Sequence, residues 1–416
     1  MSSAAGPQAF KPAKAPVGLV VLLGVLTAYA PLSIDMYLPS LPAIGRAFHA
    51  SPDAAQATLA SFLAGLALGQ LVYGPASDRW GRRGPILIGA ALYAAASIAC
   101  ALAPSLPALI VARFVQALGG CAGTVVARAV VRDRFGHRDS ARVLSLLMLV
   151  MGLAPILAPL AGGALLGFGG WRTIFWVLTV LGSLIAVAAF FALPESRSAE
   201  TAAQARGEHP ARAYLELLRQ PQLVGFVLAG ALNSAALFAY VSGSPGLLIG
   251  LYGVKPADFG WIFGANAFGM VAMSQLNGRL LHTRTPEQIV ALVRPVSLVF
   301  AVLMAGAAAT GFAGMWGVLV PLFFLMGTFG LIGPNTIAGG LNIDPRRAGS
   351  VSALMGAAQF AVGAVASGVT GAIHARSALP MSAVILACIV ASTVALYTMA
   401  LPPKARTPRG PSAPAR

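Results

Sequence analysis

Twelve apolar blocks, each about 20 residues long, alternate with polar segments along this sequence. Because a helix rises about 1.5 Å per residue, each block is long enough to cross the roughly 30 Å of hydrocarbon in a bilayer. With 57% hydrophobic and only 10% charged residues, the chain has too little charge to cover a soluble surface. We therefore expect an all-α membrane protein with twelve transmembrane helices. The expected spans are residues 17–38, 53–73, 85–103, 107–130, 140–166, 172–193, 221–243, 257–278, 289–311, 314–340, 348–372 and 379–401.

The blocks fall into two sets of six. Asp53 and Asp258, each just after a Pro, open the second block of each set and are 205 residues apart, and Gln70-Leu71 matches Gln275-Leu276 at the same offset. This repetition predicts two six-helix bundles with a central cavity between them. The expected divisions are an N-terminal segment (1–16), a first bundle (17–193), a linker (194–220), a second bundle (221–401) and a basic tail (402–416).

The basic residues are concentrated in alternate loops. Membrane proteins retain Lys and Arg on the cytoplasmic side, so both termini, the linker and the tail are expected to face the cytoplasm. The net charge of +16 then indicates contact with the anionic inner leaflet of the bilayer rather than with nucleic acid.

One acid and one base lie deep within the apolar blocks. Asp35 is the carboxylate that lies away from the block ends, and Arg113 is the deeply placed base, since Arg128 and Arg294 fall near cytoplasmic ends. Charge inside a membrane is costly, so such residues usually face a cavity and serve in function. We expect Asp35 and Arg113 to couple transport to protons. Two alternatives remain open: a permanent pair that only fixes packing, and an Asp35 solvated near the outer interface.

Uncharged polar residues at similar depth are candidates for a substrate cavity. Each one could instead form a hydrogen bond between helices. The second set of blocks has no deep charge, which favours a rather neutral, amphiphilic substrate. The candidates are Tyr29, Gln116, Asn233, Tyr240, Asn266, Asn335 and Gln359.

The loop expected between the second and third blocks reads GPASDRWGRRG. Its spacing G-x-x-x-D-R-x-G-R-R resembles the signature of the major facilitator superfamily. In that family these residues help to latch the two bundles together in the outward-facing state, and we expect the same cytoplasmic gate here. The motif residues are Gly74, Asp78, Arg79, Gly81, Arg82 and Arg83.

Two further segments are similar to motifs of this superfamily. LIVARFVQALGG in the fourth block matches a family pattern at Arg113, Gln116 and Gly119, while LAPILAPLAGG in the fifth resembles the antiporter motif of drug exporters. Small residues there allow close helix contact, and ordinary helix packing is the alternative explanation. The antiporter-motif residues are Pro155, Ala158, Pro159, Gly162 and Gly163.

With SIDMYLPSLP and ARAVVRDRF, these segments resemble the Bcr/CflA-type drug-resistance branch of the superfamily. The resemblance implies proton-coupled efflux of small toxic molecules or antibiotics from the bacterial inner membrane. Export of a metabolite such as an amino acid is the alternative. Some relatives have a second acid in the first span, where this chain has Thr27 or Ala28, so a strongly cationic substrate is in doubt. Because nucleotide-binding and zinc motifs are missing, we expect no enzyme activity, no cofactor and no metal. We also expect a monomer.

Overall fold

The computed structural model describes residues 17–135, 137–197, 210–373 and 377–401. The expected segments 1–16 and 402–416 and part of the linker lie outside the described residues. The first half contains α1 (Val17–Asp35), η1 (Leu38–Ser40), α2 (Leu41–Ala47), α3 (Pro52–Trp80), α4 (Arg83–Ala101), α5 (Leu106–Arg134), α6 (His137–Gly169) and α7 (Trp171–Ala192). The second half contains α9 (Pro210–Leu218), α10 (Pro221–Pro245), η2 (Gly246–Leu251), α11 (Pro256–Leu280), α12 (Pro286–Thr310), α13 (Gly314–Ile343), η3 (Pro345–Arg347), α14 (Ala348–Ala372), α15 (Leu379–Ala395) and η4 (Leu396–Ala400).

Every regular element in the described residues is helical, as the sequence predicts, and eleven helical segments there are long and apolar enough to cross a membrane. The remaining expected span, residues 257–278, lies within α11, a helix of 25 residues that contains the amides Asn266, Gln275 and Asn277. Large apolar side chains such as Ile88 and Phe191 are 68% and 81% exposed on the outside of the fold. Such a surface suits lipid rather than water.

Helix boundaries follow local capping signals. Ser51 and Ser105 accept hydrogen bonds from the backbone amides of Ala54 and Ala108, and Thr285 forms a reciprocal capping box with Gln288. At their other ends α3 and α5 continue past the apolar blocks to Trp80 and Arg134. The loop expected at GPASDRWGRRG is therefore shorter than the motif, since α3 carries the motif as far as Trp80, Gly81 and Arg82 connect the helices, and α4 begins at Arg83.

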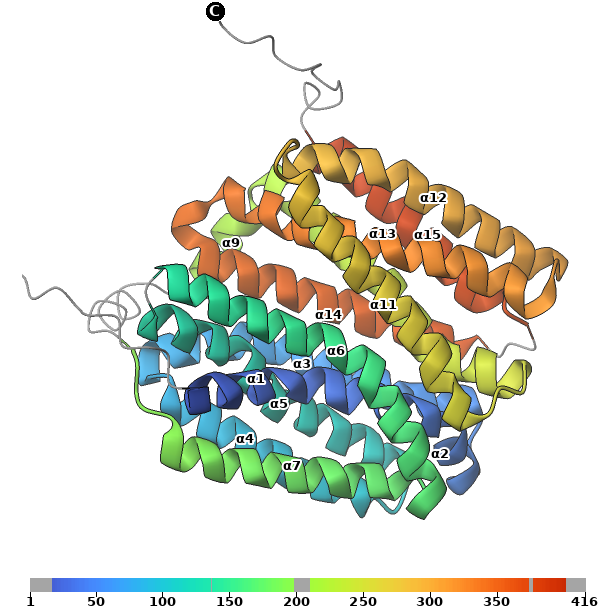
Figure 1. Ribbon diagram of the computed structural model, residues 1–416, viewed down its shortest axis with the longest axis horizontal. Helices are drawn as coiled ribbons and strands as arrows, with labels where there is room; N and C mark the ends of the chain where they lie inside the picture. Colours follow the sequence, from blue (N-terminus) through green and yellow to red (C-terminus); the bar gives the residue numbers. More distant parts are fainter. Residues whose placement is uncertain (1–16, 136, 198–209, 374–376, 402–416) are drawn as a thin grey trace, which may run out of the picture.

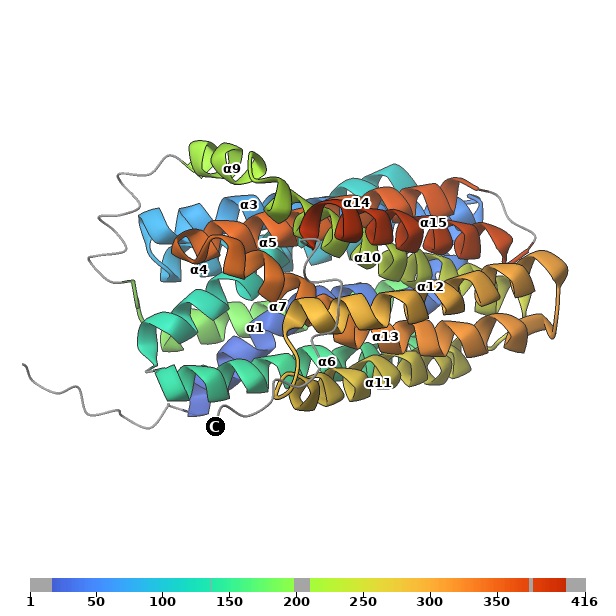
Figure 2. The same ribbon diagram turned by 90° about the horizontal axis from the view of Figure 1, so that it is seen from above.

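The two halves of the chain form two adjacent groups of helices (Figure 1). Helix α3 packs along α14, and α6 packs along α11, so these two pairs join the halves. Seen after a quarter turn, α9 lies outside the main layers, near α3 and α14 (Figure 2). It packs on α10 and α14, and Glu216 on α9 pairs with Arg347 at an N–O distance of 2.7 Å.

We name the two ends of the fold by their residues: the motif end holds residues 74–83, and the Asp35 end holds Asp35 and η1. At the Asp35 end the halves are in contact, because η1 packs on α10 and α11, and α2 packs on η2. On α6, a side chain at Gly162 would collide with the backbone carbonyl of Met36, and one at Gly163 would come 2.7 Å from the carbonyl oxygen of Pro256 on α11. Glycine lets three helices approach closely here.

Replacing Gly162 with alanine is expected to destabilise this packing. The added methyl group meets backbone rather than a flexible side chain, so a helix has to move, at an expected cost of about 1–3 kcal/mol. Thermal unfolding of the purified protein in detergent measures the effect. The matched control is Gly167→Ala on the same helix, where an added Cβ has no neighbour within 4 Å. Equal melting temperatures for the two variants would contradict this account of the packing.

Candidate functional site

A cavity of about 420 Å³ lies between the two halves, a size that suits a small organic molecule. Helices α1, α3, α5 and α6 line it from the first half, and α10, α11, α13 and α14 line it from the second. Both halves therefore shape the site. Its polar side chains are Asp35, Gln70, Thr124, Arg128, Tyr240, Asn266, Ser352 and Gln359.

Asp35 is the last residue of α1, and its side chain lines this cavity. The residue is 5% exposed and forms neither a hydrogen bond nor an ion pair with any other described residue. Tyr240 of α10 lines the same cavity. A buried carboxylate without a partner is costly as an anion, and uptake of a proton removes that cost. The site can therefore hold an exchangeable proton.

Arg113 lies outside the cavity, in the core of the first half. Its guanidinium donates to Gln116 Oε1 at 2.7 Å and to the carbonyl of Ser33 at 3.0 Å, and it lies over the Phe62 ring at 4.1 Å. Within the described part of the chain, Asp35 and Arg113 do not form an ion pair. The bond to Ser33 instead fixes the last turn of α1, whose carbonyls lack helical partners.

Three of the uncharged residues named from the sequence line the cavity: Tyr240, Asn266 and Gln359. Asn266 Nδ2 donates to the Tyr240 hydroxyl at 3.0 Å, and the Tyr240 ring stacks on Phe263 with centroids 5.3 Å apart. Asn266 Oδ1 is buried and has no hydrogen-bond partner among the described residues, so one acceptor at the cavity is available to a ligand.

The other four uncharged candidates do not line this cavity. Tyr29 stacks on Tyr93 with centroids 4.2 Å apart, and Gln116 bonds Arg113 and Ser97. Asn335 donates to Asn277 at 2.6 Å. These side chains connect helices, which is the alternative that the sequence left open. The fourth, Asn233, accepts a hydrogen bond from Arg294 at 3.3 Å.

Two arginines depart from the sequence-based expectation. Arg128 lines the cavity, although its position in the sequence placed it near a cytoplasmic end. Arg294 is fully buried in the second half, and among the described residues its Nε and Nη2 have no hydrogen-bond partner, so this half also contains a buried charge. The helical spacing of four residues between Thr124 and Arg128, both on the cavity side of α5, was the signal available in the sequence.

Methionines form much of the apolar wall. They come from both halves of the fold, and aromatic rings of Phe238, Phe263 and Phe360 join them. Thioether side chains are flexible and polarisable, so such a wall adapts to ligands of different shape. The methionines are Met148, Met151, Met270, Met326 and Met355.

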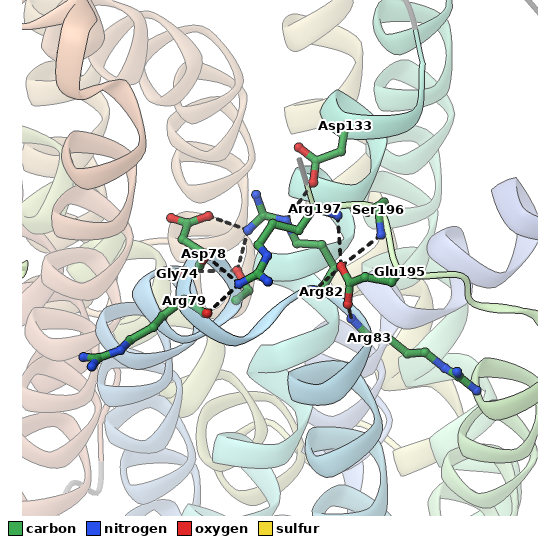
Figure 3. Close-up of polar contacts among 10 residues, drawn as sticks. Gly74, Asp78, Arg79, Arg82, Arg83, Asp133, Glu195, Ser196 and Arg197 are labelled. Carbon is green, nitrogen blue, oxygen red and sulfur yellow. Dashed lines mark hydrogen bonds and ion pairs between the residues drawn. The ribbon is translucent and has the colours of Figure 1, made fainter. Parts of the chain in front are cut away.

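The gate motif forms a compact polar network at the motif end (Figure 3). Arg82 is 4% exposed and pairs with Asp78 of α3 and, at 2.7 Å, with Asp133 of α5. Burial alone would lower the pKa of Arg82, but hydrogen bonds to the two carboxylates raise it overall. Arg79 points away from the network, and Arg83 donates to the Phe190 carbonyl at 2.7 Å. The ion pairs of Arg82 thus lie within the first half.

Glu195, which follows α7, completes this network and was not named from the sequence. Its carboxylate accepts hydrogen bonds from the backbone amides of Arg82, Arg83, Ser196 and Arg197 at 2.9–3.2 Å. Burial alone would raise the pKa of Glu195. The four donors together have the larger effect, and they hold the pKa below the usual value of a glutamate. Gly81 has φ +97° and faces this carboxylate, so a side chain there would be strained and would collide with it.

The antiporter motif lies along α6 between the cavity and the Asp35 end. Pro155 lines the cavity, and Ala158 is buried. Gly162 and Gly163 form the close contacts with α1 and α11 described above. Pro159 lies within the same continuous helix. The motif thus joins the two halves through α6.

Comparison with known proteins places these features in a family. The chain is 35% identical over 389 residues to the uncharacterized MFS-type transporter YdgK of Bacillus subtilis, covering 92% of this chain and 95% of the relative. It is 32% identical to a bicyclomycin resistance protein homolog of Haemophilus influenzae (91% and 95% covered) and 30% identical to a chloramphenicol resistance protein of Pseudomonas aeruginosa (91% and 88% covered).

A solved structure shares the fold. The bacterial homolog of the human lysosomal transporter Spinster, in an inward-facing and unoccupied conformation, superposes with a TM-score of 0.71 at 18% identity, covering 92% of this chain and 96% of that one. Residues 23–368 also match the Major Facilitator Superfamily as a whole. These matches confirm the resemblance drawn from the sequence motifs: the chain is a multi-pass membrane transporter rather than an enzyme, and it belongs to the Major Facilitator Superfamily.

Proposed function

We propose that this protein exports small amphiphilic toxic molecules or antibiotics in exchange for protons. The observation that carries the proposal is the unpaired, buried carboxylate of Asp35 in a cavity shared by both halves. The relatives named for bicyclomycin and chloramphenicol resistance support antibiotics as substrates. The adaptable methionine wall supports a broad range of apolar ligands.

The proposal includes a topology. Twelve spans cross the bacterial inner membrane, with residues 17–193 and 221–401 as the two bundles of a monomer. The motif end and both termini face the cytoplasm, because the basic loops belong on that side. Contacts at the Asp35 end and the polar cavity near the motif end then correspond to a state open to the cytoplasm.

The transport cycle follows from this arrangement. In the state that opens to the cytoplasm, Asp35 releases its proton and the cavity takes up substrate. After the bundles rock, substrate leaves outward and a proton from outside occupies Asp35. One proton moving inward releases about 2.3 kcal/mol per 100 mV of membrane potential. In the opposite state the gate motif is expected to hold the two bundles together at the motif end. In the present state the ion pairs of Arg82 lie within the first half and do not join the bundles.

Arg113 acts in this scheme as a positioning residue. By its bond to the Ser33 carbonyl it fixes the end of α1, two residues before Asp35. A change in the Asp35 charge can then alter the packing of α1, and through Met36 that of α6.

Asp35→Asn is expected to abolish stimulation of efflux by a pH gradient, because an amide side chain does not exchange a proton in this pH range. Chloramphenicol transport into inverted membrane vesicles, with and without an imposed gradient, measures this. Asp258→Asn, which removes an exposed carboxylate at the start of α11, is the matched control and should respond to the gradient like wild type. Full gradient-driven transport by Asp35→Asn would refute the assignment of Asp35.

Glu195→Gln is expected to lower thermal stability at neutral pH by weakening the bonds to the loop amides. Because the folded-state pKa of Glu195 is depressed, its contribution is fully present above the usual glutamate pKa. That contribution disappears as the pH falls through the folded value, so the two melting curves should converge in acid. Melting in detergent across pH tests this, with Glu287→Gln in the first turn of α12 as control. A difference that persists at the lowest pH would contradict the role of the carboxylate charge.

A further inference from the structure

A second cavity of about 420 Å³ lies at the motif end and meets the first one at a junction of three polar residues. Gln70 of α3, Arg128 of α5 and Ser352 of α14 line both cavities. A Cβ at Gly356 of α14 would lie 3.0 Å from Gln70 Oε1, so the Gln70 side chain spans the gap between the two halves. A molecule passing between the cavities therefore meets these three side chains.

The junction offers hydrogen-bond donors that are not engaged by any other residue in the described part of the chain. Within the described residues, the side chains of Gln70, Arg128 and Ser352 form no hydrogen bond or ion pair. The guanidinium, the amide and the hydroxyl are all donors. Asp78, which also lines the second cavity, is already paired with Arg82. A half-buried guanidinium without a counter-ion is costly in a membrane protein, and an anion bound there would relieve that cost.

Asp35 is too distant to serve as the partner of Arg128. Helices α1 and α5 run antiparallel, because Gly123 packs on the Leu26 carbonyl whereas Arg113 bonds the Ser33 carbonyl. Asp35 lies nine residues beyond Leu26, and Arg128 lies five residues beyond Gly123 in the opposite direction. At 1.5 Å per residue, their Cα atoms are about 20 Å apart along the helices. The two charges therefore occupy opposite ends of the first cavity, with the methionine wall between them.

We propose that Gln70, Arg128 and Ser352 form a binding site for an acidic or strongly hydrogen-bond-accepting group on the exported molecule. The apolar part of that molecule then lies on the methionine wall, toward Asp35. This inference rests on the proposed export function and specifies its substrate class: amphiphiles with an anionic or acceptor group at one end. Arg128 sets the specificity, because it supplies the charge.

Two fluorescent probes that differ by a single sulfonate test this site: anionic 8-anilinonaphthalene-1-sulfonate and neutral N-phenyl-1-naphthylamine. Their affinities are measured for the full-length protein in nanodiscs, with protein-free nanodiscs as blanks. Arg128→Gln should weaken the anionic probe by about tenfold or more, since hydrogen bonds to charged groups contribute about 1.5–3 kcal/mol. The neutral probe should be unaffected, and Arg128→Lys should retain part of the preference for the anion.

Arg132→Gln is the matched control, because Arg132 lies one turn further along α5 and lines the second cavity but not the first. Equal weakening of both probes by Arg128→Gln would show a merely structural role and overturn the proposal. An equal loss of anion binding in Arg132→Gln, or no loss in Arg128→Gln, would also overturn it. Binding requires no proton gradient, so failure here leaves the antiport proposal to its own test with Asp35→Asn.

Discussion

The cost of burying charge away from water shapes this protein more than any other constraint. Arg113 meets part of that cost with two hydrogen bonds and three aromatic rings, and it becomes part of the packing of α1. Asp35 lies two residues beyond the carbonyl that Arg113 holds, and no described residue forms a hydrogen bond or ion pair with its side chain. The fold thus treats these two buried charges in opposite ways: Arg113 is held in place by neutral groups of the core, whereas Asp35 faces a cavity where it can exchange a proton.

Hydropathy accounts for how much of the fold could be predicted. Apolar blocks of the right length indicate where the helices lie, and the spacing of Gly, Asp and Arg indicates the motif end. Asp35 is conspicuous because it is a single acid in an apolar block. Helix ends are predicted less accurately, since α3 and α5 continue through polar residues that an apolar block does not include.

Which polar side chains face the cavity could not be predicted in the same way. A membrane helix is apolar on its lipid side and largely apolar on its packed side, so the sequence hardly indicates which side faces a cavity. In the sequence Tyr29 and Gln116 therefore look equivalent to Tyr240 and Gln359, although only the latter pair line the cavity. Arg128 could not be predicted as a cavity residue, because its position near the end of an apolar block does not indicate whether its side chain faces the space between the bundles.

The glycines of α6 have a mechanical consequence. Where Gly162 and Gly163 meet α1 and α11, the touching surfaces are backbone rather than interlocking side chains. Interdigitated side chains would have to disengage before two bundles could rotate, which would add an energy barrier to every transport cycle. A backbone contact without interlocking side chains has no such barrier. It keeps the two bundles in contact at one place while they rotate relative to one another.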